Sequence, residues 1–108
     1  MKKIFISSPY TLGDTGENVR NQILAADQLM TAGYTSFIPL LSHFQHLVCP
    51  RPYDDWLAND LEWLPVCNAL LRLPGESAGA DLEVAKAIEL GIPVYYSIDD
   101  IIKIDSKQ

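Results

Sequence analysis

The chain has 108 residues, of which 48% are hydrophobic and 20% charged, so it is long enough for one hydrophobic core and has the composition of a folded globular protein. Its net charge is −6, from 14 acidic and 8 basic residues, and the basic residues do not cluster. This argues against polymeric nucleic acid as a partner, because such binding needs a row of cations along the phosphates. A small anionic ligand would have to be held locally, by backbone N–H groups and hydroxyls.

The sequence gives no sign of a membrane span or a secretory signal. Every apolar run is shorter than the roughly 18 residues that a membrane helix needs, and Met-Lys-Lys leads directly into the short apolar stretch Ile4–Ile6. Two cysteines, Cys49 and Cys67, form no CxxC pair. We therefore expect a cytoplasmic protein with reduced thiols and no membrane partner.

The first half of the chain is predicted to alternate strands and helices. A buried strand is expected over Lys3–Ser7, a loop over Ser8–Gly16, a helix over Glu17–Ala32 and a second strand over Thr35–Leu40. The segment Leu41–Pro52 contains two histidines and two prolines and is expected to be irregular. The apolar stripe of the predicted helix consists of Val19, Ile23, Ala26 and Met30.

The second half continues the alternation. A helix is expected over Asp54–Pro65, a strand over Ala69–Leu73, a helix over Ala80–Leu90 and a strand over Ile92–Tyr96. The segment Ser97–Asp100 matches a capping box with Asp in place of Glu, and it should open a short last helix. The leucines expected to face the core from the first of these helices are Leu57, Leu61 and Leu64.

Regular alternation of this kind predicts right-handed βαβ crossovers. We expect a single three-layer α/β domain over residues 1–108, of Rossmann- or flavodoxin-like type, with a four- or five-stranded parallel sheet. Ligands of such sheets bind outside the carboxyl ends of the strands. The candidate loops are therefore Ser7–Gly16, Leu41–Asp54 and Pro74–Glu83.

The loop that ends at Glu83 carries the clearest chemical pattern. It leaves a strand, turns with Gly75 and Gly79, and enters a helix whose first N–H groups can hold an anion, with the Ser77 hydroxyl as a further donor. Glu83 is expected in or near the first helical turn, where the helix dipole favours the ionised carboxylate. Such a carboxylate suits attack on a sugar C1 or support of an oxocarbenium ion. Alternatively, the loop is a glycine-rich turn and Glu83 only stabilises its helix.

A second acid, Asp60, is expected in a different environment. It shares a helical face with Trp56 and Trp63, at spacings of four and three residues. Burial against apolar rings raises the pKa of a carboxyl group and lets it act as a proton donor. One ionised and one protonated carboxyl group form the pair that glycosidic cleavage requires. The alternative for Asp60 is a solvated helix charge.

Two elements of the sequence together resemble a known family. They are Asn59-Asp60-Leu61-Glu62-Trp63-Leu64, with the strand after it, and Gly75-x-Ser77-x-Gly79-x-x-x-Glu83. They resemble the nucleoside 2-deoxyribosyltransferase superfamily, including its relatives that hydrolyse nucleoside 5′-monophosphates. The likeness runs from Ile4-Phe5-Ile6 and the loop Ser7-Ser8-Pro9-Tyr10 to the strand that ends at Tyr96.

This resemblance implies roles for particular residues. Glu83 matches the family nucleophile that takes the sugar C1, and Asp60 matches the acid near the departing base. Phe5 stands where the family often has a tyrosine whose hydroxyl touches the nucleophile. The residues that the resemblance places near the substrate or its 5′-phosphate are Ser7, Ser8, Tyr10, Ser77 and Gly79.

The activity implied is cleavage of the N-glycosidic bond of a nucleoside 5′-monophosphate or nucleoside, by hydrolysis or base exchange, without a metal or organic cofactor. The family also implies a homodimer or a dimer of dimers, in which C-terminal residues of a neighbour, here within Ser97–Gln108, help to complete each site. The apolar face with Trp56 and Trp63 would supply the interface.

Other functions remain open at this point. One is a non-catalytic nucleotide-binding or sensing module with the same fold, and another is a structural or interaction subunit. A metal site at His43, His46 and Cys49 is a weaker alternative, because three ligands on one loop lack a fourth nearby. A loop that contacts the substrate is the preferred interpretation of that segment.

Overall fold

The computed structural model describes residues 2–106, and they form a four-stranded sheet in which all neighbouring strands are parallel. The strand order is β2-β1-β3-β4. The strands are β1 (Lys3–Ser7), β2 (Thr35–Phe37), β3 (Ala69–Arg72) and β4 (Val94–Tyr95). The predicted α/β class with a parallel sheet is thereby confirmed, with four strands.

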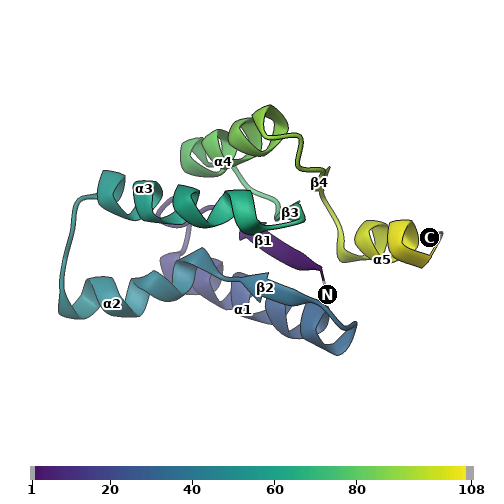
Figure 1. Ribbon diagram of the computed structural model, residues 1–108. Helices are drawn as coiled ribbons and strands as arrows, with labels where there is room; N and C mark the ends of the chain where they lie inside the picture. The colour runs from purple at the N-terminus through teal and green to yellow at the C-terminus, as the bar shows by residue number, and fades with distance from the viewer. Residues whose placement is uncertain (1, 107–108) are drawn as a thin grey trace.

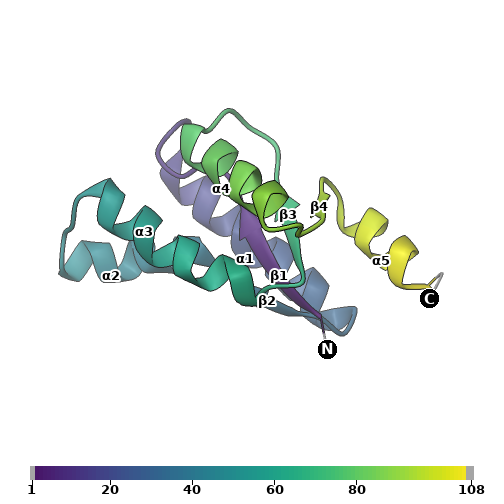
Figure 2. The ribbon, with the colours of Figure 1, turned by 45° about the horizontal axis from the view of Figure 1, so that its top comes forward.

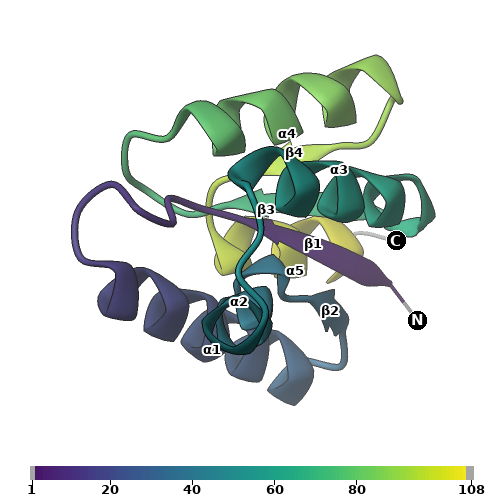
Figure 3. The ribbon, with the colours of Figure 1, turned by 90° about the vertical axis from the view of Figure 1, so that its left-hand side faces the viewer.

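Helices cover both faces of the sheet (Figure 1). In Figure 3, α3 and α4 lie on one side of the strands, whereas α1 and α5 lie on the other. The helices are α1 (Thr15–Thr31), α2 (Ser42–Val48), α3 (Tyr53–Trp63), α4 (Ala78–Glu89) and α5 (Ile98–Ser106), and 3-10 turns occupy Pro39–Leu41 and Leu64–Val66.

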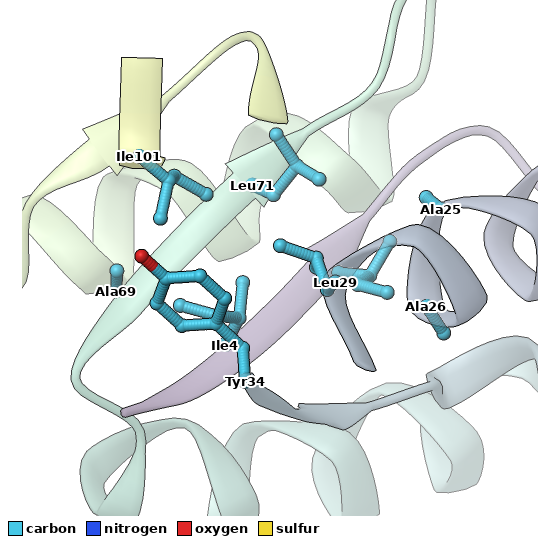
Figure 4. Packing of buried hydrophobic residues seen from close by; sticks show 9 residues of the cluster. Ile4, Ala25, Ala26, Leu29, Tyr34, Ala69, Leu71 and Ile101 are labelled. Carbon is cyan, nitrogen blue, oxygen red and sulfur yellow. The ribbon is translucent and has the colours of Figure 1, made fainter. Parts of the chain in front are cut away.

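The alternation of side chains along β1 separates two hydrophobic clusters. Ile4 and Ile6 point towards α1 and α5, where they pack with Leu29 and Ile101 (Figure 4). Phe5 points to the opposite face, in a cluster with Leu70 of β3, Ala87 of α4 and the buried Leu64 and Cys67 that follow α3. Ser7, two residues after Phe5, therefore faces α4 at the carboxyl end of the strand.

The segment expected to be irregular contains a helix instead. A 3-10 turn over Pro39–Leu41 continues into α2, and irregular backbone begins only at Cys49. The apolar residues of α2, Phe44, Leu47 and Val48, do have helical spacing, but they are exposed and the helix buries none of its residues. The two prolines that suggested a loop, Pro50 and Pro52, come after the helix.

The buried stripe of α1 also differs from the prediction. Val19 and Ala26 are buried as expected, but Ile23 is 40% exposed and Met30 71% exposed. Their place is taken by Gln22, Ala25 and Leu29. A polar residue in the stripe shifts the apparent apolar face, and Gln22 is tolerated there because its amide is fully hydrogen-bonded.

Strand β3 ends one residue earlier than predicted, and β2 and β4 are each three residues shorter, with a proline beside one end of both. β2 ends at Phe37, since Pro39 has no N–H group for a ladder and begins the 3-10 turn instead. β4 begins only after Pro93, whose carbonyl still accepts from the Leu70 N–H at 2.9 Å. Within the described residues, no helix is long and apolar enough to cross a membrane.

Candidate active site

A cavity of about 340 Å³ opens at the carboxyl ends of β1 and β3. Its walls come from the loop after β1, the segment around α2, the buried face of α3 and the first turns of α4. Helices α3 and α4 run side by side in the same direction, so that both begin at the cavity (Figure 2). Of the residues predicted at the site, the following line the cavity: Ser8, Tyr10, Asp60, Ser77, Gly79 and Glu83.

Glu83 lies on the buried stripe of α4, between Ala80 and Ala87. The helix begins at Ala78, two residues earlier than predicted, and Ser77 caps it by accepting from the Ala80 N–H at 3.0 Å. The expectation that Glu83 lies in or near the first turn was therefore wrong, and the first-turn acid is Asp81. Glu83 is only 6% exposed.

The environment of Glu83 makes its carboxyl group a weaker acid than an ordinary glutamic acid side chain. Burial raises its pKa to about 7, and the nearby charge of Asp60 acts in the same direction. A hydrogen bond from Ser7 and the charge of Arg72 lower the pKa without cancelling the effect of burial. Glu83 therefore titrates close to neutral pH, whereas the position expected from sequence would have kept it ionised.

Asp60 on α3 is also buried, with 8% exposure. Burial raises its pKa to about 7, as predicted from the neighbouring rings. Only one of the two tryptophans is buried with it: Trp56 is 9% exposed, whereas Trp63 is 51% exposed and stacks on Phe37 with ring centroids 5.5 Å apart. At neutral pH, Asp60 can hold a proton and donate it.

Ser7 lies beneath the cavity rather than on its wall. Its side chain is fully buried, and Oγ donates to Glu83 Oε1 at 2.6 Å. The hydroxyl is thus engaged with the carboxyl group in this structure, and is not turned to a ligand phosphate. The Ser7 hydroxyl lies on the same face of β1 as the buried ring of Phe5. Phe5 is the position where the family that this sequence resembles often has a tyrosine.

Gln22 is a site residue that sequence reasoning missed. Its Nε2 donates to the Ile6 carbonyl at 3.2 Å and to Ser8 Oγ at 2.8 Å, and its Oε1 accepts from the Leu40 N–H at 3.1 Å. One buried amide thereby joins β1, the loop after it and the turn that leads into α2. The available signal was a polar residue within the helical stripe of α1.

The two histidines of α2 form hydrogen bonds with side chains that line the cavity. Tyr10 Oη and His43 Nδ1 are hydrogen-bonded at 2.6 Å, and the Trp56 indole N–H donates to His46 Nδ1 at 3.0 Å. Among the described residues, no group of three or more His, Cys, Asp or Glu side chains is placed to hold a metal ion. The set His43, His46 and Cys49 is therefore not a preformed metal site.

The loop between β3 and α4 is fixed by Arg72 and Gly75. Gly75 has φ +120°, and a Cβ atom there would lie 2.6 Å from Pro9 Cγ, so only glycine lets the two loops meet. Arg72 donates to the carbonyls of Leu73 and Gly75, the second at 2.7 Å, and lies 3.5 Å from Asp81 Oδ1. Sequence reasoning missed Arg72, which holds the loop that carries Ser77 to the cavity.

Comparison with known proteins finds no matching family model and no matching curated protein. A solved structure does match: the 2-deoxyribosyltransferase from the psychrotolerant bacterium Bacillus psychrosaccharolyticus, characterised as a biocatalyst for the synthesis of nucleosides. The TM-score is 0.62 and the sequence identity 22%, over 85% of this chain and 69% of that one. The two proteins share a fold. This confirms the Rossmann- or flavodoxin-like class predicted from the sequence.

Proposed function

We propose that this protein cleaves the N-glycosidic bond of a nucleoside 5′-monophosphate or nucleoside, releasing the base to water or exchanging it for another base. The observation that carries the proposal is a pair of buried carboxyl groups, Glu83 and Asp60, at one cavity, each with a pKa raised to about 7. Structural likeness to a 2-deoxyribosyltransferase supports the same chemistry.

The active form of the pair carries one proton. The Ser7 hydrogen bond and the charge of Arg72 both favour the ionised form of Glu83, and the opposing charge of Asp60 is absent when Asp60 holds the proton. Burial raises the pKa of Asp60 and so favours its protonated form. Glu83 is therefore the nucleophile and Asp60 the proton donor. Two acids with different surroundings divide these roles in the way glycosidic cleavage requires.

The reaction proceeds in two steps with overall retention at C1. In the first, a Glu83 oxygen bonds to C1 while the bond from C1 to the base nitrogen breaks, and Asp60 gives its proton to the leaving base. In the second, Asp60 takes a proton from water, whose oxygen bonds to C1 and displaces Glu83. A second base in place of water gives exchange instead of hydrolysis.

The 5′-phosphate of the substrate lies at the start of α4. Ser77 Oγ accepts from the Ala80 N–H, which leaves its O–H free to donate to a phosphate oxygen. The first N–H groups of a helix have no intrahelical partner and carry partial positive charge. Ser8 and Tyr10 also line this cavity and contact the substrate there, while Ser7 holds Glu83.

A chromatographic screen tests this function. The protein is incubated with nucleosides and nucleoside monophosphates, with and without a second base, and released and exchanged bases are quantified. Base release by the wild type but not by Glu83→Gln supports the proposal. Saturable nucleotide binding without turnover would instead favour a sensing module.

We also propose that residues 1–108 act as one domain within a homodimer or dimer of dimers. Exposed apolar side chains are present on α2 and, separately, at the end of α3 and in the 3-10 turn after it: Phe44, Leu47, Val48, Trp63 and Val66. Of the C-terminal segment expected to reach a neighbour's site, α5 packs through Ile101 on the face opposite α3 and α4. Residues 107–108 lie outside the described part of the chain.

A further inference from the structure

Tyr53, the first residue of α3, lies directly on the backbone of α4. A Cβ atom added to Gly79 would be 1.7 Å from Tyr53 Oη and 3.0 Å from Cζ. The same position is 3.9 Å from Ser77 Oγ. The phenol hydroxyl therefore sits beside Ser77, at the start of α4, and the absence of a side chain at Gly79 makes room for it.

The hydroxyl of Tyr53 is available to a ligand. Within the described residues, Oη has no hydrogen-bond partner, and the ring lines the cavity while remaining 48% exposed. Burial and the charges of Glu83 and Asp60 raise the pKa of Tyr53, so the group stays protonated and keeps its O–H donor at neutral pH. The Tyr53 O–H can therefore donate to an acceptor on a ligand in the cavity.

The position of Tyr53 along α3 indicates which part of the ligand it meets. Tyr53 and Asp60 are seven residues apart, so they lie on one helical face about 10 Å apart along the axis. Asp60 serves the base end of the substrate, and Tyr53 with Ser77 lies at the other end. The acceptor that a nucleotide presents at that end is its 5′-phosphate.

We propose that the Tyr53 hydroxyl donates a hydrogen bond to the 5′-phosphate and, with Ser77 and the first N–H groups of α4, determines the selectivity for nucleoside monophosphates over nucleosides. This inference rests on the proposed function, since it assigns the phosphate end of the same cavity. The lack of a side chain at Gly79 then lets the phenol approach the start of α4 closely enough for Tyr53 and Ser77 to bind the same phosphate.

The test compares the wild type with Tyr53→Phe, which removes only the hydroxyl, and with Tyr96→Phe as a matched control. Tyr96 is 66% exposed and does not line this cavity. The values of kcat/KM are measured for a nucleoside monophosphate and its nucleoside, and the Kd of the monophosphate is measured by calorimetry. We expect Tyr53→Phe to lower kcat/KM and affinity for the monophosphate about tenfold or more, with less than about twofold change for the nucleoside. Tyr96→Phe should change neither value.

The outcomes separate this inference from the proposed function. Equal losses for nucleotide and nucleoside would reveal a packing role, and no loss would remove Tyr53 from recognition; either result overturns the inference while cleavage stands. Weaker monophosphate binding by Tyr53→Phe, in a protein that releases no base, would support the phosphate contact and refute the cleavage. A wild type that neither binds nor cleaves nucleotides refutes both.

Discussion

Ser7 Oγ donates a hydrogen bond of 2.6 Å to Glu83 Oε1, and so joins residues 76 positions apart in the chain. Both side chains are buried, and the bond lowers the pKa of a carboxyl group that burial raises. Ser7 thereby orients the proposed nucleophile and favours its ionised form.

Ser7→Ala should reduce kcat/KM about 10- to 100-fold and change its dependence on pH. Because the hydrogen bond lowers the pKa of Glu83, its loss raises that pKa further above the ordinary value. The acidic limb of the pH profile should move to higher pH. Ser36→Ala is the matched control, since the buried Ser36 Oγ has no hydrogen-bond partner in the described structure. An unchanged acidic limb in Ser7→Ala would contradict this role.

Glu83→Gln should lower base release by several orders of magnitude while the fold remains intact, because a nucleophile has no substitute in the site. Circular dichroism checks the fold, and product analysis under single-turnover conditions checks the chemistry. Near-normal turnover by the variant, on any substrate that the wild type cleaves, would show that Glu83 is not the nucleophile.

Asp60→Asn should impair cleavage less for substrates with good leaving groups, since these need less protonation as the bond to C1 breaks. The measurement compares kcat for a natural nucleotide with kcat for one whose base is a much stronger acid. A defect of equal size on both substrates would assign Asp60 to a role other than proton donation.

Stability should fall as the pH rises from about 4 to about 7. In the unfolded chain Glu83 and Asp60 lose their protons near their ordinary values of 4.5 and 3.8, whereas in the folded chain both lose them at about 7. Between these pH values the folded state binds more protons, so the free energy of unfolding decreases with pH. Thermal unfolding across this range should give a falling Tm. Glu83→Gln should flatten the slope by removing one of the two groups, and an unchanged slope would exclude its contribution.

Leu47→Glu should dissociate the proposed homo-oligomer, because it places a charge within the exposed apolar surface of α2. Light scattering at micromolar concentration gives the assembly state of wild type and variant. Met30→Glu is the control, since Met30 is 71% exposed on α1 and is not part of the apolar surface of α2. A wild type that is monomeric at about 12 kDa and fully active would refute the proposal that the protein acts as a homo-oligomer.

The sequence was sufficient for the class of fold, and it led to loops that border the candidate cavity. Buried strands such as Ile4–Ile6 have strong local signals, since apolar periodicity is a property of a few adjacent residues. The rule that ligands lie outside the carboxyl ends of parallel strands then led to the loop before Glu83. The raised pKa of Asp60 also followed, because Trp56 is its neighbour one helical turn away.

Tertiary structure alone decided what each polar group does. Ser7 lies against Glu83, Gln22 joins three segments, and Tyr53 rests on Gly79 only because residues distant in sequence meet at the cavity. Helix α2 was missed because Pro50 and Pro52 suggested a loop, and both prolines come after the helix. The charge state of Glu83 was also mispredicted from its position in the helix: burial outweighs the helix terminus, and burial depends on everything that packs around a group. Local pattern determines which elements form, whereas long-range packing determines which hydroxyl meets which carboxylate.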